Sequence, residues 1–152
     1  MNHRAIVLAS LFTLGACAST VHTLGYSADW PDADVTVGNQ RYQVWFHDKD
    51  PTVLIQHGAP RPLGQMLAQN LTIYSQAPSS GIAVWGAAAN AVLNQIRCSA
   101  TEVTGADQMR EVRYQCDAGV DVGAAVAEHR AQWRQGVRVD APVPPPGPAT
   151  GY

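Results

Sequence analysis

The stretch VTVGNQRYQVWFHDKDPTVLIQ, residues 35–56, decides the fold of this chain. Tyr42, Val44 and Phe46 alternate with other residues, which is the period of a β-strand. The Gly38-Asn39 pair and the polar run 47–51 are typical of turns. Residues 52–56 are a short apolar run that suits a more buried strand. The stretch therefore predicts three short strands in an antiparallel meander.

A second strand pair is predicted downstream, because residues 101–103 and 110–116 flank the turn-like run 104–107. If Asp107 is the midpoint of this hairpin, Cys98 and Cys116 lie directly opposite each other. Directly paired strand positions are close enough for a disulfide. Such a bridge is worth about 3 kcal/mol in the chain-entropy model. We therefore expect a Cys98–Cys116 disulfide.

The register of this hairpin has two candidate solutions. The cysteine pairing also matches Glu102 with Val112, whereas a slip of one residue matches Val103 with Val112 and better suits a buried face. A β-bulge near Gly105 would reconcile the two.

Two segments have helical patterns. In residues 82–97, Trp85, Val92 and Ile96 recur at helical spacing, after a serine at the expected N-cap. Residues 122–135 follow Asp121 as a second N-cap and place Trp133 on an apolar stripe. Residues 63–76 fit a helix or a strand equally well. The fold class predicted is α+β, with a small antiparallel sheet packed on one or two helices.

The chain of 152 residues has room for one domain. We expect a signal peptide over 1–16, a flexible tether over 17–34, a single α+β domain over 35–139 and a Pro-rich disordered tail over 140–152. Net charge is −2, from 10 basic and 12 acidic residues, which argues against a nucleic-acid partner.

The N-terminus carries Arg4 and then ten uncharged residues, 5–14, a run too short to span a bilayer. Residues 14–17, Leu-Gly-Ala-Cys, resemble the lipobox of bacterial lipoproteins. The resemblance covers residues 1–17 only, and implies lipid on Cys17 and anchoring to a membrane. Ala18 in place of Asp resembles the signal for the outer membrane. The alternative is an ordinary signal peptide cut after Ala18, which would remove Cys17. With Cys17 lipidated, the other two cysteines form one pair in an oxidising compartment.

Candidate site residues are few. His47, Asp48 and Asp50 form a weak metal-binding pattern, and His57 precedes a Gly/Pro loop of the kind that often carries function. Trp45 is either core or an exposed partner surface. The carboxylates of Asp29, Asp32 and Asp34 are expected to be solvated in the linker.

No nucleophile or phosphate-loop motif accompanies these residues, and no cofactor is expected. The sequence thus favours a non-enzymatic, lipid-anchored envelope protein with an envelope partner. The alternative is a small periplasmic enzyme or ligand-binding protein with a site near His47, Asp48 and His57.

Overall fold

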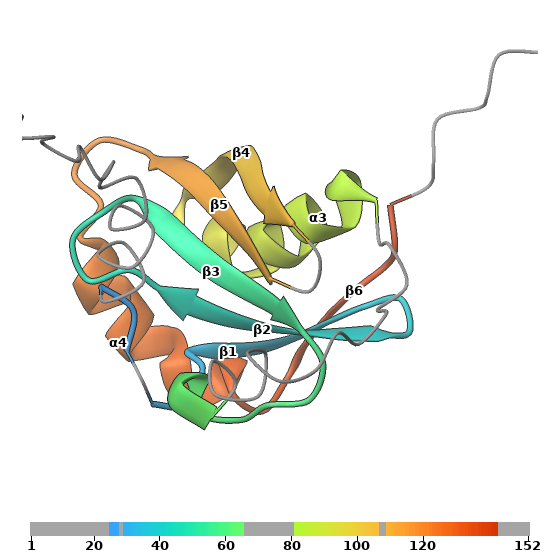
Figure 1. Cartoon of the computed structure of the whole chain (residues 1–152). Helices are drawn as coiled ribbons and strands as arrows, with labels where there is room; N and C mark the ends of the chain where they lie inside the picture. Colours follow the sequence, from blue (N-terminus) through green and yellow to red (C-terminus); the bar gives the residue numbers. More distant parts are fainter. Residues whose placement is uncertain (1–24, 28, 66–80, 107–108, 143–152) are drawn as a thin grey trace, which may run out of the picture.

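The computed structural model describes residues 25–27, 29–65, 81–106 and 109–142. They form an α+β fold in which helices pack on a curled six-stranded sheet of order β4-β5-β3-β2-β1-β6 (Figure 1). The elements are β1 (Ala33–Val37), β2 (Gln40–Phe46), β3 (Thr52–His57), α3 (Ile82–Leu93), the 3₁₀ turn η1 (Asn94–Ile96), β4 (Cys98–Ala106), β5 (Met109–Cys116), α4 (Val122–Trp133) and β6 (Val137–Val139). The predicted fold class is confirmed.

The meander forms as expected, with Val35 opposite Tyr42 in β1–β2 and Val44 opposite Ile55 in β2–β3. The prediction of a purely antiparallel sheet is wrong in one place. β6 pairs with β1 in parallel, with Val137 opposite Val35. The run Val137–Val139 is too short for its alternation to indicate a strand, and only its position beside β1 makes it one.

The hairpin contains both predicted registers. Cys98 lies opposite Cys116, and Val103 lies opposite Val112. A register shift between Ala100 and Glu102 joins the two, so the expected bulge near Gly105 and the pairing of Glu102 with Val112 are wrong. The bulge lets the disulfide form at one end of the hairpin while Val112 stays in the core.

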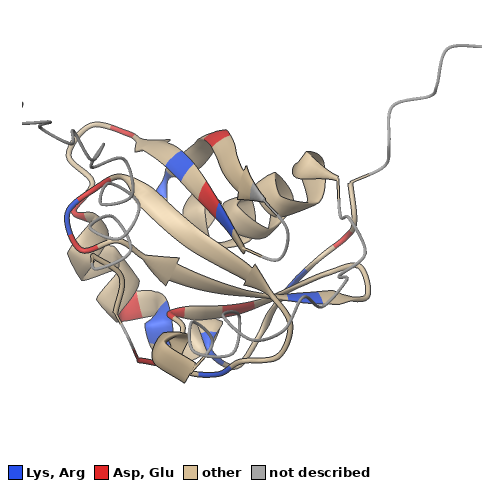
Figure 2. Cartoon of the chain, in the orientation of Figure 1, with Lys and Arg blue, Asp and Glu red and all other residues tan. Residues whose placement is uncertain are grey.

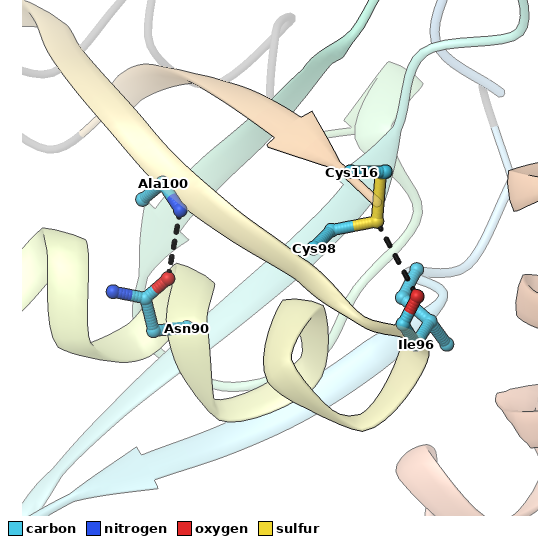
Figure 3. Close-up of a disulfide and its surroundings, with 5 residues drawn as sticks. All are labelled: Asn90, Ile96, Cys98, Ala100 and Cys116. Atoms are coloured by element: carbon cyan, nitrogen blue, oxygen red, sulfur yellow. Dashed lines mark hydrogen bonds between the residues drawn. A yellow bond between two sulfur atoms is a disulfide. The ribbon is translucent and has the colours of Figure 1, made fainter. Parts of the chain in front are cut away.

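The Cys98–Cys116 disulfide links the start of β4 to the end of β5 (Figure 3). Cys98 Sγ lies 3.5 Å from the Ile96 carbonyl oxygen. This contact is not a hydrogen bond, because a disulfide sulfur carries no proton. Beside it, the backbone N–H of Ala100 donates to Asn90 Oδ1 at 2.8 Å. β4 is therefore fixed both to β5 and to α3.

The two predicted helices are present but end earlier than the pattern suggested. α3 ends at Leu93 and is followed by the 3₁₀ turn η1. Arg97, with a left-handed φ of 57°, ends this turn. Its N-cap is Gly81, without a side-chain hydrogen bond, rather than a serine. In α4, Asp121 accepts a hydrogen bond from the Ala124 N–H, which confirms this cap.

The two faces of the sheet bury different clusters. α3 and α4 cover one face, where Trp85 and Trp133 pack against Tyr42, Val44 and Phe46 (Figure 1). On the opposite face a smaller cluster comprises Tyr26, Trp45, Leu54 and Leu63, with Met109 packed against it. No charged residue lies in β3 or in the 42–46 part of β2, so the centre of the sheet is uncharged (Figure 2).

The folded domain begins before the expected boundary at residue 35. Tyr26 is buried and bridges to His47, and β1 already starts at Ala33. The C-terminal part of the expected 17–34 tether is therefore part of the fold. Residues 1–24, 66–80 and 143–152 lie outside the described residues, and with them the lipobox, most of segment 63–76 and the Pro-rich tail. Within the described ranges, no helix has both the length and the apolar character needed to cross a bilayer.

Candidate functional site

A groove of about 720 Å³ lies at one end of the sheet. Its walls come from residues 25–27, the β2–β3 turn, the last residues of β5 and the N-terminal half of α4. We call it the turn groove, and the side chains that define it are Tyr26, Asp32, His47, Lys49, Tyr114 and Arg130. Its volume is within the range of small-ligand sites, which makes it the first place to look for function.

His47 holds the β2–β3 turn together. Its Nδ1 accepts hydrogen bonds from the backbone N–H groups of Lys49, at 3.2 Å, and Asp50, at 2.8 Å. The proton is therefore on Nε2, which lies 3.7 Å from a carboxylate oxygen of Asp50. The side chain is only 6% exposed, and its ring packs edge-on against Tyr26. His47 is thus committed to turn geometry rather than presented to a ligand.

Gly25 packs directly against the imidazole ring of His47. A Cβ at this position would overlap the imidazole ring of His47. The Gly25 carbonyl also accepts the Asp48 N–H at 2.9 Å, so the N-terminal segment and the turn are joined through backbone as well as side chain. His47, Asp48 and Asp50 do not form a metal-binding group, and no three His, Cys, Asp or Glu side chains do so elsewhere in the described ranges.

Asp32 and Asp34 were expected to be solvated, and the structure shows the opposite. Asp32 is 6% exposed; its Oδ1 accepts from Arg130 Nε at 2.7 Å and its Oδ2 from the Phe46 N–H at 2.9 Å. Asp34 is ion-paired with Arg41, whose pKa is raised by the hydrogen bond to this carboxylate. Both carboxylates are paired with arginines, and this pairing offsets the free-energy cost of burying a charged group.

Two tyrosines contribute uncharged side chains to the lining of the groove. The Tyr26 hydroxyl donates to Thr52 Oγ1 at 2.8 Å, and burial raises the pKa of Tyr26 well above its ordinary value. Burial also raises the pKa of Tyr114.

Trp45 is core and not a partner surface. The side chain is fully buried on the sheet face opposite the helices, and its Nε1 donates to the Asp29 carbonyl at 3.1 Å. The neighbouring cross-strand pair, Gln43 and Gln56, is buried as well. Tyr26 and Leu63 pack in the same cluster as Trp45, so this tryptophan is not exposed.

His57 lies far from His47. It pairs with Tyr42 at the other end of the β2–β3 ladder, and its ring contacts that tyrosine at 5.4 Å between centroids. Five residues of extended strand separate Tyr42 from His47, about 16 Å. The structure therefore does not bring the three residues His47, Asp48 and His57 into one site.

Sequence reasoning missed the residues that build the turn groove. Arg130 lies in the second predicted helix and reaches Asp32 across 98 residues of sequence. Tyr26 fell inside the expected tether. No local signal marks such partners, because the contacts join segments that only the folded sheet brings together.

The chain matches no protein-family model, and neither a curated protein nor a solved structure matches it.

Proposed function

We propose that this chain is a lipid-anchored accessory protein of a bacterial cell envelope, held at the outer membrane through Cys17 and binding another envelope component. The observation that carries the proposal is the pairing of the cysteines. Cys98 and Cys116 form the disulfide, so the one remaining cysteine of the sequence is Cys17. It follows the uncharged run 5–14 after Gly15 and Ala16. An exported protein in an oxidising space accounts for both facts.

The folded domain supports a binding role over a catalytic one. His47, in the turn groove, accepts hydrogen bonds from the backbone of the turn, and His57 lies at the opposite end of the β2–β3 ladder. A general base needs a partner within hydrogen-bond reach of a reacting group. His47 and His57 do not lie beside each other, and the sequence carries no nucleophile motif.

The anchor is tested by the mass of the mature protein purified from membranes. We expect an N-terminus at Cys17 carrying a diacylglycerol and an acyl chain, and loss of membrane association in Cys17→Ala. Ala18→Asp is the matched control, because it keeps the lipidation site and changes only the sorting residue. It should move the protein from the outer to the inner membrane. A mature chain that begins at Ser19 without lipid would contradict the proposal.

The partner is sought by crosslinking the lipidated protein in its native membrane and identifying the captured species by mass spectrometry. One reproducible envelope protein, absent when Cys17→Ala is expressed at the same level, is the expected result. Equal capture by the anchored and unanchored forms would show that the anchor does not serve partner binding.

A second candidate is a ligand-binding role for the turn groove. It is favoured by the groove's size and by Tyr114, whose hydroxyl-bearing side chain lines it. Tyr114→Phe removes this hydroxyl and keeps the ring in the core. If this variant fails to complement a deletion strain while its thermal stability is unchanged, the groove takes part in function. Full complementation by Tyr114→Phe and Lys49→Ala together would argue against it.

A further inference from the structure

Trp30 is the one tryptophan that the fold leaves in solvent. Trp30 is 53% exposed, whereas Trp45, Trp85 and Trp133 are buried. The residues around it in sequence are not loose, since Tyr26 and Asp32 are both buried. A large amphipathic ring held outside a well-packed domain points to a contact with something else.

The backbone on both sides of the Trp30 indole is fixed. The Asp29 carbonyl accepts hydrogen bonds from Trp45 Nε1, at 3.1 Å, and from the Leu63 N–H, at 3.2 Å. Arg134 at the end of α4 donates to the next two carbonyls, from Nη2 to Trp30 at 3.3 Å and from Nε to Pro31 at 2.8 Å. Three consecutive carbonyls are thus held, so a contact made by the ring costs little further ordering of the chain.

Charges of both signs lie near the ring, and the exposed Asp29 directly precedes it in the chain. Arg134 is exposed and is held against the backbone of Trp30 itself. The carboxylate of Asp32, close by in sequence, is already paired with Arg130. Tryptophan concentrates at the boundary between headgroups and acyl chains, and an arginine beside it can keep its charge among the headgroups.

The chain between the lipidation residue and the domain is short. Gly25 lies eight residues after Cys17, so even a fully extended chain keeps it within about 29 Å of the lipid. Trp30 follows on the same segment, five residues further on. The anchor would therefore hold this side of the domain near the bilayer at a high effective concentration, where the weak affinity of a single ring is sufficient.

We propose that Trp30, with Arg134 beside it, docks on the phospholipid surface of the membrane that holds the Cys17 acyl chains, and so sets the orientation of the domain. This inference rests on the proposed lipid anchor.

The test uses the full lipidated protein in phosphatidylcholine vesicles that contain a share of dibrominated phosphatidylcholine. Bromine quenches tryptophan emission only at short range. We expect emission to fall in brominated vesicles relative to ordinary ones, and this loss to disappear in Trp30→Phe, which keeps an aromatic ring but not the emission. The three buried tryptophans serve as the constant background. Acrylamide added from the water should quench Trp30 less in vesicles than in detergent-free soluble Cys17→Ala protein.

Ile82→Ala is the matched control, because Ile82 is 60% exposed at the start of α3 and is not part of the docking surface. It should leave the bromine quenching unchanged. Emission that brominated lipid does not affect, in protein whose mass includes the lipid, would overturn the docking and leave the anchor standing. Trp30 that acrylamide reaches in vesicles but not in native membranes would also overturn it, in favour of a protein partner. A protein purified from membranes without the lipid mass would overturn the anchor and the docking together.

Discussion

The buried carboxylate of Asp32 offers the sharpest test of the fold. It receives the Phe46 N–H on one oxygen and the Arg130 Nε on the other, and so joins the N-terminal segment, β2 and α4. We expect Asp32→Ala to lower the free energy of unfolding by about 2–3 kcal/mol. About 1–3 kcal/mol comes from leaving the buried Phe46 N–H without an acceptor. The ion pair adds at most about 1 kcal/mol, because the Arg130 side chain is 43% exposed and water screens it.

The assay is urea unfolding of the mature chain with its disulfide oxidised, followed by circular dichroism. With a urea dependence of about 2 kcal/mol per molar, typical of a small protein, the midpoint of Asp32→Ala should fall by about 1 M. Asp32→Asn is the matched control: it keeps the shape and one oxygen acceptor for Phe46, and should cost about 1 kcal/mol or less. The reasoning is refuted if Asp32→Ala unfolds at the wild-type midpoint, or if Asn costs as much as Ala.

Three further predictions concern the disulfide, the turn and the tyrosines. Replacing both Cys98 and Cys116 by Ala should lower the free energy of unfolding by about 3 kcal/mol, since the bridge closes a span of 18 residues. Wild-type protein in excess dithiothreitol should unfold at the same urea concentration as this double variant, and a double variant as stable as oxidised wild type would contradict the expectation. His47→Ala should cost about 1–2 kcal/mol through the loss of the acceptor for two N–H groups, and His47→Asn should recover most of it because Asn caps such turns. Equal losses in these two variants, measured by thermal unfolding, would show that the acceptor is not what matters. Burial raises the folded-state pKa of Tyr26 above its ordinary value of about 10, so its contribution to stability is full below about pH 10 and falls as pH rises further. The stability of Tyr26→Phe should therefore decline less steeply in alkali than that of wild type, with a residual slope from Tyr114, whose pKa is also raised; identical alkaline profiles would exclude this role for Tyr26.

Local patterns were sufficient for the elements themselves. Alternation across residues 42–46 predicted β2, and the apolar spacing of Trp85 and Val92 predicted α3, because each element buries one face and must repeat with its own period. The boundaries were less well determined. α3 stops at Leu93 rather than 97, and a 3₁₀ turn that ends at the left-handed Arg97 follows it. Ile96 lies in this turn, but its spacing from Val92 also fits an α-helix, so the sequence pattern placed the helix end too late.

The hairpin shows how two local signals can both be right. The cysteine pair required one register, and Val103 opposite Val112 required another. Only the packed sheet decides where the extra residue goes, since the bulge must leave Val112 facing the core and the disulfide intact. The sequence contains both constraints but not the position between Ala100 and Glu102 at which they are reconciled.

The sequence by itself determined the α+β class, the meander, the cysteine pair and the two main helices, because these follow from periodicity and spacing along the chain. The tertiary structure alone decided the burial of Asp32 and Trp45, the parallel strand β6, the distance between His47 and His57, and the exposure of Trp30. Each of these depends on which distant segment lies alongside, and a partner 98 residues away leaves no periodic trace in the residues that contact it.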